Sequence, residues 1–302
     1  MIRNYFYNLY KVFRFFFKKD RYVIFFWLFG IIFTVLLLAW FFPGLYQNEA
    51  ERLVMAETMN NPAVIAMIGK NYGYLNYTAG AMYANQMLLF SALAAAIMSI
   101  LLVNRTTRVD EEEGRTELLK SFPVGRLTNL GASVLLIITV NIILALTVGF
   151  GIYFLGIETM GLGGSLLFGA ILGVTGLFFG SVTALFSQLI GSSRGTLGYS
   201  FMFLGFFYLL RAIGDVGSEA LALVSPLGII LRSRVFVNNY IWPLITVLCL
   251  CLILFLAALY INFSRDLGVA YIIRKKKHIH QKRTLSSHID LLARIQSVLI
   301  IL

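Results

Sequence analysis

The sequence predicts an all-α integral membrane protein: six transmembrane helices, an interfacial amphipathic helix before them, and a short cytoplasmic helix between spans two and three. The chain is 59% apolar and only 13% charged, whereas soluble domains carry about 25% charged residues. Its mean hydropathy is +0.82. Several apolar segments exceed the roughly 20 residues that a spanning helix needs, and they lack the alternation of a lipid-facing β-strand.

Residues 1–22 form the first predicted element, a helix lying in the inner membrane interface. On a helical projection, basic residues share one arc and apolar residues share the opposite face. The basic arc holds Arg3, Lys11, Arg14 and Lys18, and the apolar face holds Phe6, Leu9, Phe13, Phe16 and Phe17. The alternative is an ordinary positively charged anchor with some aromatic residues. Both interpretations place the segment on the cytoplasmic leaflet.

Residues 23–262 form the predicted six-span transmembrane domain, with an outer loop at 43–86, an inner loop at 104–129 and a basic cytoplasmic tail at 263–302. The spans are expected at Val23 to Phe42, Met87 to Val103 (starting as early as Gly80), Leu130 to Leu155, Leu162 to Ile190, Leu197 to Val216 and Tyr240 to Asn262. The outer loop contains a helix-prone stretch, Asn48 to Met59, which either caps a pathway or packs on its neighbours.

The distribution of basic residues predicts the orientation. Twenty of the 25 Lys and Arg residues fall in the N-terminal segment, the two inner loops and the tail, while four fall on the other side and Arg211 lies inside span five. By the positive-inside rule, both termini are expected to be cytoplasmic. The expected location is a cell membrane, and the expected source is bacterial. Since the cytoplasmic face explains the net charge of +11, no nucleic-acid partner is expected.

The loop between spans two and three contains an unusual acidic segment. Five of the 14 acidic residues lie within eight positions, at Asp110, Glu111, Glu112, Glu113 and Glu117. A helix from Asp110 to Ser121 is predicted, with the acids at its favourable N-terminal end and an i,i+4 pair between Glu111 and Arg115. Pro123 should end it. Because the inner leaflet is negative, this helix should face water or another protein; the alternative is a merely solvated loop.

Two groups of residues inside the spans are candidates for a role in transport. Arg211 and Asp215 are four apart in span five, which favours an intramembrane ion pair, with direct substrate contact as the alternative. In span four, the spacing of Gly169, Gly173, Gly176 and Gly180 favours close helix packing over a translocation-lining face. Asn141, in the middle of span three, should form an interhelical hydrogen bond.

The sequence contains no pattern that indicates chemistry on this chain. It lacks a GxxxxGK[ST] phosphate-binding loop, so nucleotide chemistry would require another chain. No catalytic constellation is found. No metal site is expected, because the three histidines (His278, His280 and His288) lie in the basic tail without a carboxylate or cysteine cluster.

Several motifs resemble the membrane subunits of ATP-binding-cassette (ABC) exporters of the second class, specifically the permeases of polyketide-antibiotic and multidrug export. The acidic segment "EEEGRTELL" followed by "PVGR" carries the likeness most clearly. The matching residues are Glu111, Glu112, Glu113, Gly114, Arg115, Glu117, Leu118, Leu119, Pro123, Val124, Gly125 and Arg126. Further likeness lies in "QLIGSSRGTLGYS", "YLLRAIGDVG", "SPLG" and "SRDLG".

This resemblance implies a function and partners. The acidic segment, together with Asp110, would be a coupling helix that seats in a groove of a separate ATPase subunit. That subunit would hold ATP and Mg²⁺, and this chain would hold no cofactor and move an amphipathic drug, antibiotic or lipid outward. The competing class is a standalone membrane protein, either a secondary transporter or a structural or immunity protein. A secondary transporter would be expected to carry more carboxylates near mid-membrane than Asp215 alone.

The chain departs from the family pattern in length. Members usually carry two six-span halves, and this chain resembles the N-terminal one. The apolar run from Leu291 to Leu302 is too short to span a bilayer. A truncated product, a half completed by a second six-span chain and a half-transporter that forms a homodimer all remain open.

Overall fold

The computed structural model describes residues 5–45, 48–73 and 77–264, and within these ranges the regular elements are helices, with no β-strand. Among these described residues, six helices are long and apolar enough to cross a membrane. They are α2 (Leu9–Leu45), α5 (Ala79–Asn104), α8 (Thr128–Phe154), α9 (Leu162–Leu189), α10 (Ser193–Val216) and α13 (Trp242–Ser264). The all-helical, six-span fold class is therefore confirmed. The basic tail from residue 265 onward, with its histidines and apolar end, lies outside the described residues.

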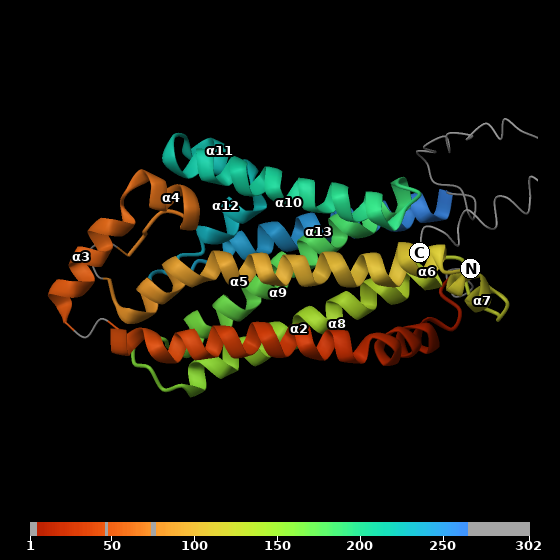
Figure 1. The fold of residues 1–302 in the computed structure, drawn as a ribbon, viewed down its shortest axis with the longest axis horizontal. Helices are drawn as coiled ribbons and strands as arrows, with labels where there is room; N and C mark the ends of the chain where they lie inside the picture. The colour runs from red at the N-terminus through yellow and green to blue at the C-terminus, as the bar shows by residue number, and fades with distance from the viewer. Residues whose placement is uncertain (1–4, 46–47, 74–76, 265–302) are drawn as a thin grey trace, which may run out of the picture. The chain divides into compact units, whose positions relative to one another are not determined.

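Short helices gather at the two ends of the bundle (Figure 1). At one end, which we call the α7 end, α5 continues into the π-helical turn η2 (Arg105–Val109) and α6 (Asp110–Glu112), followed by α7 (Arg115–Lys120). At the other, the α4 end, lie α3 (Glu49–Met59), α4 (Pro62–Ile68), α11 (Glu219–Val224) and α12 (Pro226–Leu231). The helix predicted within Asn48 to Met59 is confirmed as α3, whereas α11 and α12 were not expected from the sequence.

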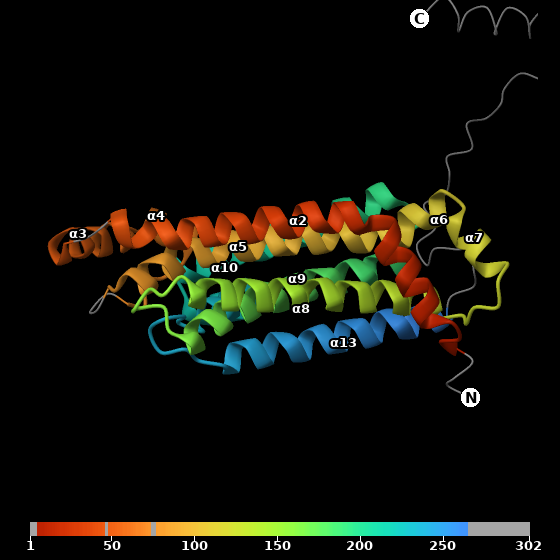
Figure 2. The ribbon, with the colours of Figure 1, turned by 90° about the horizontal axis from the view of Figure 1, so that it is seen from below.

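The first span is longer than expected. The sequence suggested an interfacial helix over residues 1–22 and a separate span from Val23, but one helix, α2, runs from Leu9 through both and includes Pro43 in its last turn. No glycine or proline lies between Leu9 and Gly30 to interrupt it, so helical hydrogen bonding continues. Figure 2 shows the N-terminal part of α2 turning across the α7 end of the bundle.

The amphipathic pattern predicted for the N-terminal part of α2 is seen only in part, because Phe17 of the predicted apolar face is exposed. Lys11, Arg14 and Lys18 are exposed, whereas Phe16 is fully buried. Val12, one turn earlier on the same side as Phe16, is also buried. The N-terminal part of α2 thus turns an apolar side toward the bundle, while its position in a membrane interface stays a prediction.

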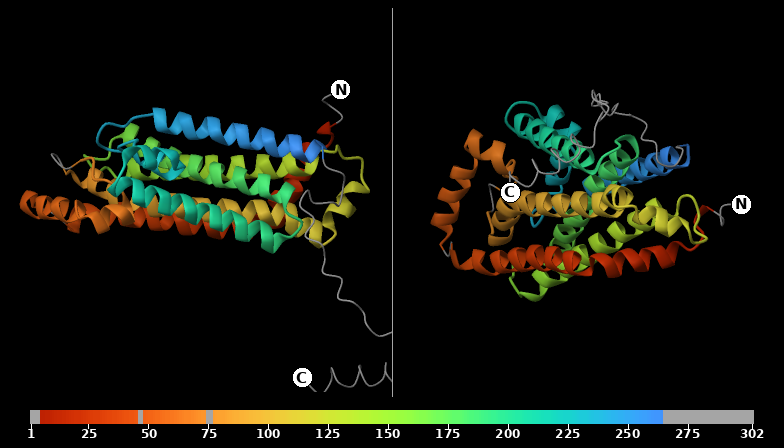
Figure 3. Two further views of the ribbon diagram at one scale, coloured as in Figure 1. Left: turned by 90° about the horizontal axis from the view of Figure 1, so that it is seen from above. Right: turned by 45° about the vertical axis from the view of Figure 1, so that its right-hand side comes forward.

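Helix α9 lies at the centre of the bundle and is its most buried span. It packs against α8, α5 and α13, and the views in Figure 3 show the long helices running side by side. The four glycines of its small-residue face lie against α8. A Cβ atom added at Gly169 would overlap the Ala145 carbonyl oxygen, and one added at Gly176 would overlap the Asn141 side chain. The close approach of the two helices requires glycine at these points.

A polar contact crosses the middle of this packing. The Asn141 side-chain amide of α8 donates to the Ser99 hydroxyl of α5 at 3.0 Å and to the carbonyl of Ile137 at 2.9 Å. The interhelical hydrogen bond predicted for Asn141 is therefore confirmed. It satisfies an amide that would be costly to leave unpaired in an apolar interior.

Candidate functional site

The acidic segment is built differently from the single helix that the sequence predicted. Helix α5 continues through η2 and α6 to Glu112, and the helix then breaks at Glu113 and Gly114. Gly114 has φ +73°, a left-handed conformation that glycine adopts without steric cost. A new short helix, α7, follows and ends at Lys120. The predicted helix from Asp110 to Ser121 is thus two helices joined at a glycine.

This break changes the electrostatics of the acids. Asp110 to Glu112 lie at the C-terminal end of a long helical run that begins at Ala79, not at a favourable N-terminal start. Negative charge at a helix C-terminus is unfavourable. These acids therefore need cations close by, and the chain provides them from α2, η2 and α7.

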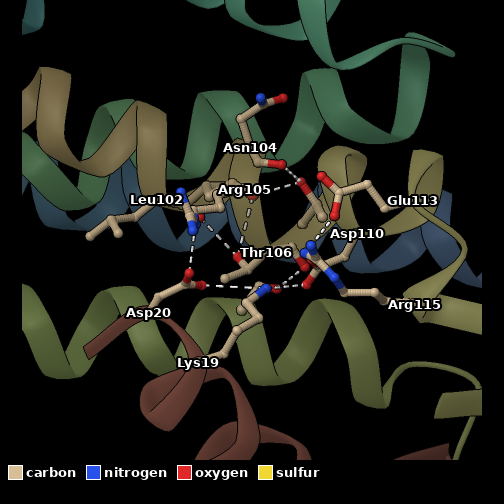
Figure 4. Close-up of polar contacts among 12 residues, drawn as sticks. Lys19, Asp20, Leu102, Asn104, Arg105, Thr106, Asp110, Glu113 and Arg115 are labelled. Atoms are coloured by element: carbon tan, nitrogen blue, oxygen red, sulfur yellow. Dashed lines mark hydrogen bonds and ion pairs between the residues drawn. The ribbon is translucent and has the colours of Figure 1, made fainter. Parts of the chain in front are cut away.

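Two fully buried carboxylates, Asp20 and Asp110, form the centre of a charge cluster at the α7 end (Figure 4). Asp110 accepts from the Lys19 ammonium and, at 2.7 Å, from the Arg115 guanidinium. Asp20 accepts from Arg105 Nε at 2.5 Å, and the Lys19 ammonium lies 3.4 Å from its second oxygen. Lys19 therefore lies between the two carboxylates and connects α2 with the end of α5 and α6.

The first three glutamates of the acidic segment, at positions 111 to 113, each have a different partner. Glu111 pairs with Arg108 and Glu113 pairs with Arg115. These ion pairs differ from the i,i+4 pair of Glu111 with Arg115 that the sequence predicted, because Gly114 redirects the chain before Arg115. Asp110 holds the pKa of the Arg115 guanidinium above its ordinary value, chiefly through their hydrogen bond.

Glu112 joins two of the sequence motifs. Its carboxylate accepts from the Ser193 backbone N–H at 2.8 Å and from the Ser193 hydroxyl at 2.6 Å. Ser193 is the first residue of α10. A carboxylate at this helix N-terminus satisfies an otherwise unpaired N–H group and interacts favourably with the helix dipole.

The chain after α7 is held by the N-terminal segment. The backbone N–H groups of Gly125 and Leu127 donate to the carbonyls of Tyr7 and Tyr5 at 3.2 and 3.0 Å. The Asn8 side-chain amide donates to the Pro123 carbonyl at 2.7 Å. The "PVGR" motif is thus a loop fastened to the chain that precedes α2.

These contacts leave one apolar surface on α7 and the residues just after it. Leu118 is 69% exposed and Phe122 is 67% exposed, and they lie four residues apart. Leu119 packs instead against the bundle core. Glu117 is exposed beside the apolar pair. The projecting tip therefore combines two apolar side chains with a negative charge, a composition suited to contact with a protein surface.

The predicted intramembrane pair lies at the α4 end. Arg211 is fully buried, its guanidinium is 3.4 Å from the Asp215 carboxylate, and it donates to the Met67 carbonyl at 3.1 Å. The Tyr208 hydroxyl also donates to the Met67 carbonyl, at 3.0 Å. This pair therefore holds the end of α4 against α10. The "SPLG" motif lies beside it, since Ser225 donates to the Phe207 carbonyl of α10 at 2.7 Å.

Sequence reasoning missed Lys19 and Asp20 as site residues. The signal was present: Asp20 is the one acid among the basic residues of "RFFFKKDRYV", directly before a long apolar run. Its partners lie far away in sequence, so their identity could not be inferred from spacing. In the described part of the chain, no cluster of three or more metal-ligating side chains is present.

The fold and this charged end define a helical, multi-pass membrane protein with a projecting segment between its second and third spans. The chain belongs to the family described as "Multidrug efflux system permease Rv1217c, C-terminal domain", which matches residues 9–262. The resemblance to exporter permeases is thereby confirmed. The description names a C-terminal domain, and the correspondence to an N-terminal half stays a prediction.

A curated relative supports the same family. The chain is 34% identical over 229 residues to the multidrug efflux system permease protein Rv1217c of Mycobacterium tuberculosis (strain ATCC 25618 / H37Rv). The matched region is 76% of this chain and 40% of the relative. The chain thus spans about two fifths of the length of the relative that it matches.

Proposed function

We propose that the chain is the membrane-spanning permease part of an ATP-driven exporter, and that a separate ABC ATPase subunit binds at its α7 end. Family membership and the motifs of the acidic segment support this proposal. The α7 end would face the cytoplasm of a cell membrane, in agreement with the excess of Lys and Arg in the segments at that end.

The observation that carries the proposal is the projecting α7 tip on a rigid base. Leu118 and Phe122 are exposed on the tip, while Asp110 and Arg115 fasten its beginning to the bundle. An apolar pair held on a fixed support is the type of feature that contributes most binding energy in a protein interface.

The same contacts would transmit movement from the ATPase to the spans. Asp110 is connected through Lys19 to α2, and Glu112 is connected directly to the first residue of α10. The segment itself is the continuation of α5. A displacement of α7 would therefore act on three spans together, which is the requirement for switching between inward- and outward-open states.

The remaining parts of the transporter follow from the family. ATP and Mg²⁺ would bind to the ATPase, and this chain would hold no cofactor. A second six-span unit, either another polypeptide or a second copy of this chain, would complete the pathway. The expected substrates are amphipathic drugs, antibiotics or lipids.

Co-purification with the ATPase subunit tests the docking surface. The double variant Leu118→Ala/Phe122→Ala should reduce the ATPase recovered with the chain about tenfold or more, because exposed apolar anchors commonly contribute about 1–3 kcal/mol each. Phe154→Ala is the matched control, since Phe154 is 79% exposed at the opposite end of the bundle. Equal recovery from wild type and the double variant would contradict the proposed dock.

Charge reversal of the acids is a less specific test. Changing Glu111, Glu112 and Glu113 to lysine would also break their contacts with Arg108, Ser193 and Arg115. A loss of ATPase binding in this variant would then be explained equally by the reversed charge on the docking segment and by the broken contacts that hold the segment in place. If the wild-type chain itself recovers no ATPase, the standalone class of membrane protein is favoured instead.

A further inference from the structure

A small cavity at the α4 end has a mainly apolar lining that also includes two cationic and two amide residues. It has a volume of about 30 Å³ and lies between the chain after α4, helix α5 and the loop that follows α12. Lys70, Asn71, Tyr72, Asn85 and Arg234 provide its polar lining. The space is far smaller than the roughly 300–1,000 Å³ of a site for a drug-sized ligand. It admits only one or two water-sized groups.

Lys70 and Arg234, the two cations at this cavity, make no ion pair with a carboxylate among the side chains that the structure describes. Two acids near the cavity are held by other residues: Asp215 by Arg211 at 3.4 Å and Glu219 by Arg232 at 3.1 Å. The negative charges of these two acids are therefore balanced by Arg211 and Arg232. Lys70 and Arg234 add two positive charges that these acids do not balance. The excess of positive charge favours an anion.

The amide of Asn71 adds a third donor. Its Oδ1 accepts from the Gly73 backbone N–H at 3.0 Å, and this contact identifies the other polar atom of the amide, Nδ2, as the donor. Nδ2 is shielded from solvent and has no hydrogen-bond acceptor among the described residues. A buried donor without an acceptor is costly, so its presence beside two cations points to an acceptor that binds in the cavity.

The loop that carries Arg234 is held in an unfavourable backbone conformation. Arg234, Phe236 and Asn239 have φ values of +47°, +60° and +54°, and such strain is concentrated at functional sites. The Arg234 guanidinium lies 4.7 Å from the ring centre of Tyr72 and 5.5 Å from that of Tyr240. These rings fix the guanidinium in place before any ligand binds.

We propose that this cavity binds a small oxyanion, a phosphate or carboxylate group, through Lys70, Arg234 and the Asn71 amide. One or two oxygen atoms of the anion would enter the cavity, and the remainder would stay outside it, in contact with Lys70 and Arg234, which are both partly exposed. The anion is either free in solution or part of a lipid headgroup. ATPase binding at the α7 end and anion binding at the α4 end can each fail without the other.

Thermal unfolding of the purified chain in neutral detergent tests the site, with inorganic phosphate as the probe and sodium chloride, whose anion has no oxygen, keeping ionic strength constant. Phosphate should raise the unfolding temperature of wild type in a saturable way. Arg234→Gln and Lys70→Gln should each weaken the apparent phosphate affinity about tenfold or more, because each removes a charge-assisted hydrogen bond. Arg52→Gln is the control, since Arg52 lies on α3 and does not line the cavity.

A second arm identifies the source of the anion. Wild type and Arg234→Gln are compared in nanodiscs of phosphatidylcholine alone and with phosphatidylglycerol. Stabilisation by phosphatidylglycerol that is lost in Arg234→Gln supports the site with a lipid headgroup as its ligand. If neither probe stabilises wild type, or if both cavity variants respond as wild type does, the proposal is wrong. Lys70→Gln keeps the test decisive if Arg234→Gln does not fold.

Discussion

At the scale of single residues, Asp20 and Asp110 determine how the α7 end is held together. Both side chains are fully buried, and a buried carboxylate is strongly unfavourable unless cations and hydrogen bonds compensate it. Lys19 contacts both of them, and Arg105 and Arg115 each contact one. Loss of Asp20 would remove the carboxylate that Arg105 contacts, whereas loss of Asp110 would leave Lys19 with Asp20 and Arg115 with Glu113.

Asp110→Asn should lower the free energy of unfolding by about 2 kcal/mol. This is less than the roughly 3–5 kcal/mol usual for a fully buried pair, because Lys19 keeps its contact with Asp20 and Arg115 keeps its pair with Glu113. Thermal or chemical unfolding in detergent measures the change. Glu117→Gln serves as control, since Glu117 is exposed. Similar stability of the two variants would show that the cluster contributes little.

At the scale of helices, glycines determine two features that composition alone does not reveal. Gly114 divides the acidic segment into α6 and α7 through its left-handed backbone. In α9, Gly169 allows the backbone of α8 to approach so closely that a Cβ atom would meet its carbonyl oxygen. A backbone atom cannot move aside as a flexible side chain can, so this contact tolerates no larger residue.

Gly169→Ala should destabilise the bundle by about 2 kcal/mol, as expected for overpacking a tight helix contact. Gly205→Ala, in α10, is the matched control, because nothing lies within 4 Å of a Cβ atom added there. The control should be neutral or stabilising by up to about 1 kcal/mol, since alanine favours helix. Unfolding in detergent measures the stability of both variants. If Gly169→Ala were as stable as Gly205→Ala, close packing at Gly169 would be ruled out.

At the scale of the whole bundle, the two ends have different chemistry. The α7 end has its buried carboxylates and projecting apolar tip, and the α4 end has the Arg211–Asp215 pair and the cationic cavity. In the proposed orientation, the α7 end is cytoplasmic and the α4 end faces outward. This assignment determines which end an ATPase could reach.

Cysteine labelling in intact cells tests the orientation. In a background where Cys249 and Cys251 are replaced by alanine, Asn238→Cys should react with a membrane-impermeant maleimide from outside. Ser121→Cys should react only after the membrane is permeabilised. Both positions are exposed. Ser121 directly follows α7 at one end, and Asn238 lies in the loop between α12 and α13 at the other. The reverse pattern of labelling would invert the proposed topology.

The sequence by itself determined the class of protein and the six spans, because hydropathy and the length needed to cross a bilayer are local properties of a segment. It also indicated that Asn141 needs an interhelical hydrogen bond, but not that Ser99 is its partner. It also located the segment whose motifs led to the permease family. Only the tertiary structure decided that Asp20 and Lys19 meet Asp110, that Glu112 binds the start of α10 and that Lys70 and Arg234 share a cavity. These contacts join residues far apart in sequence, and their geometry depends on how whole helices pack and where the chain turns.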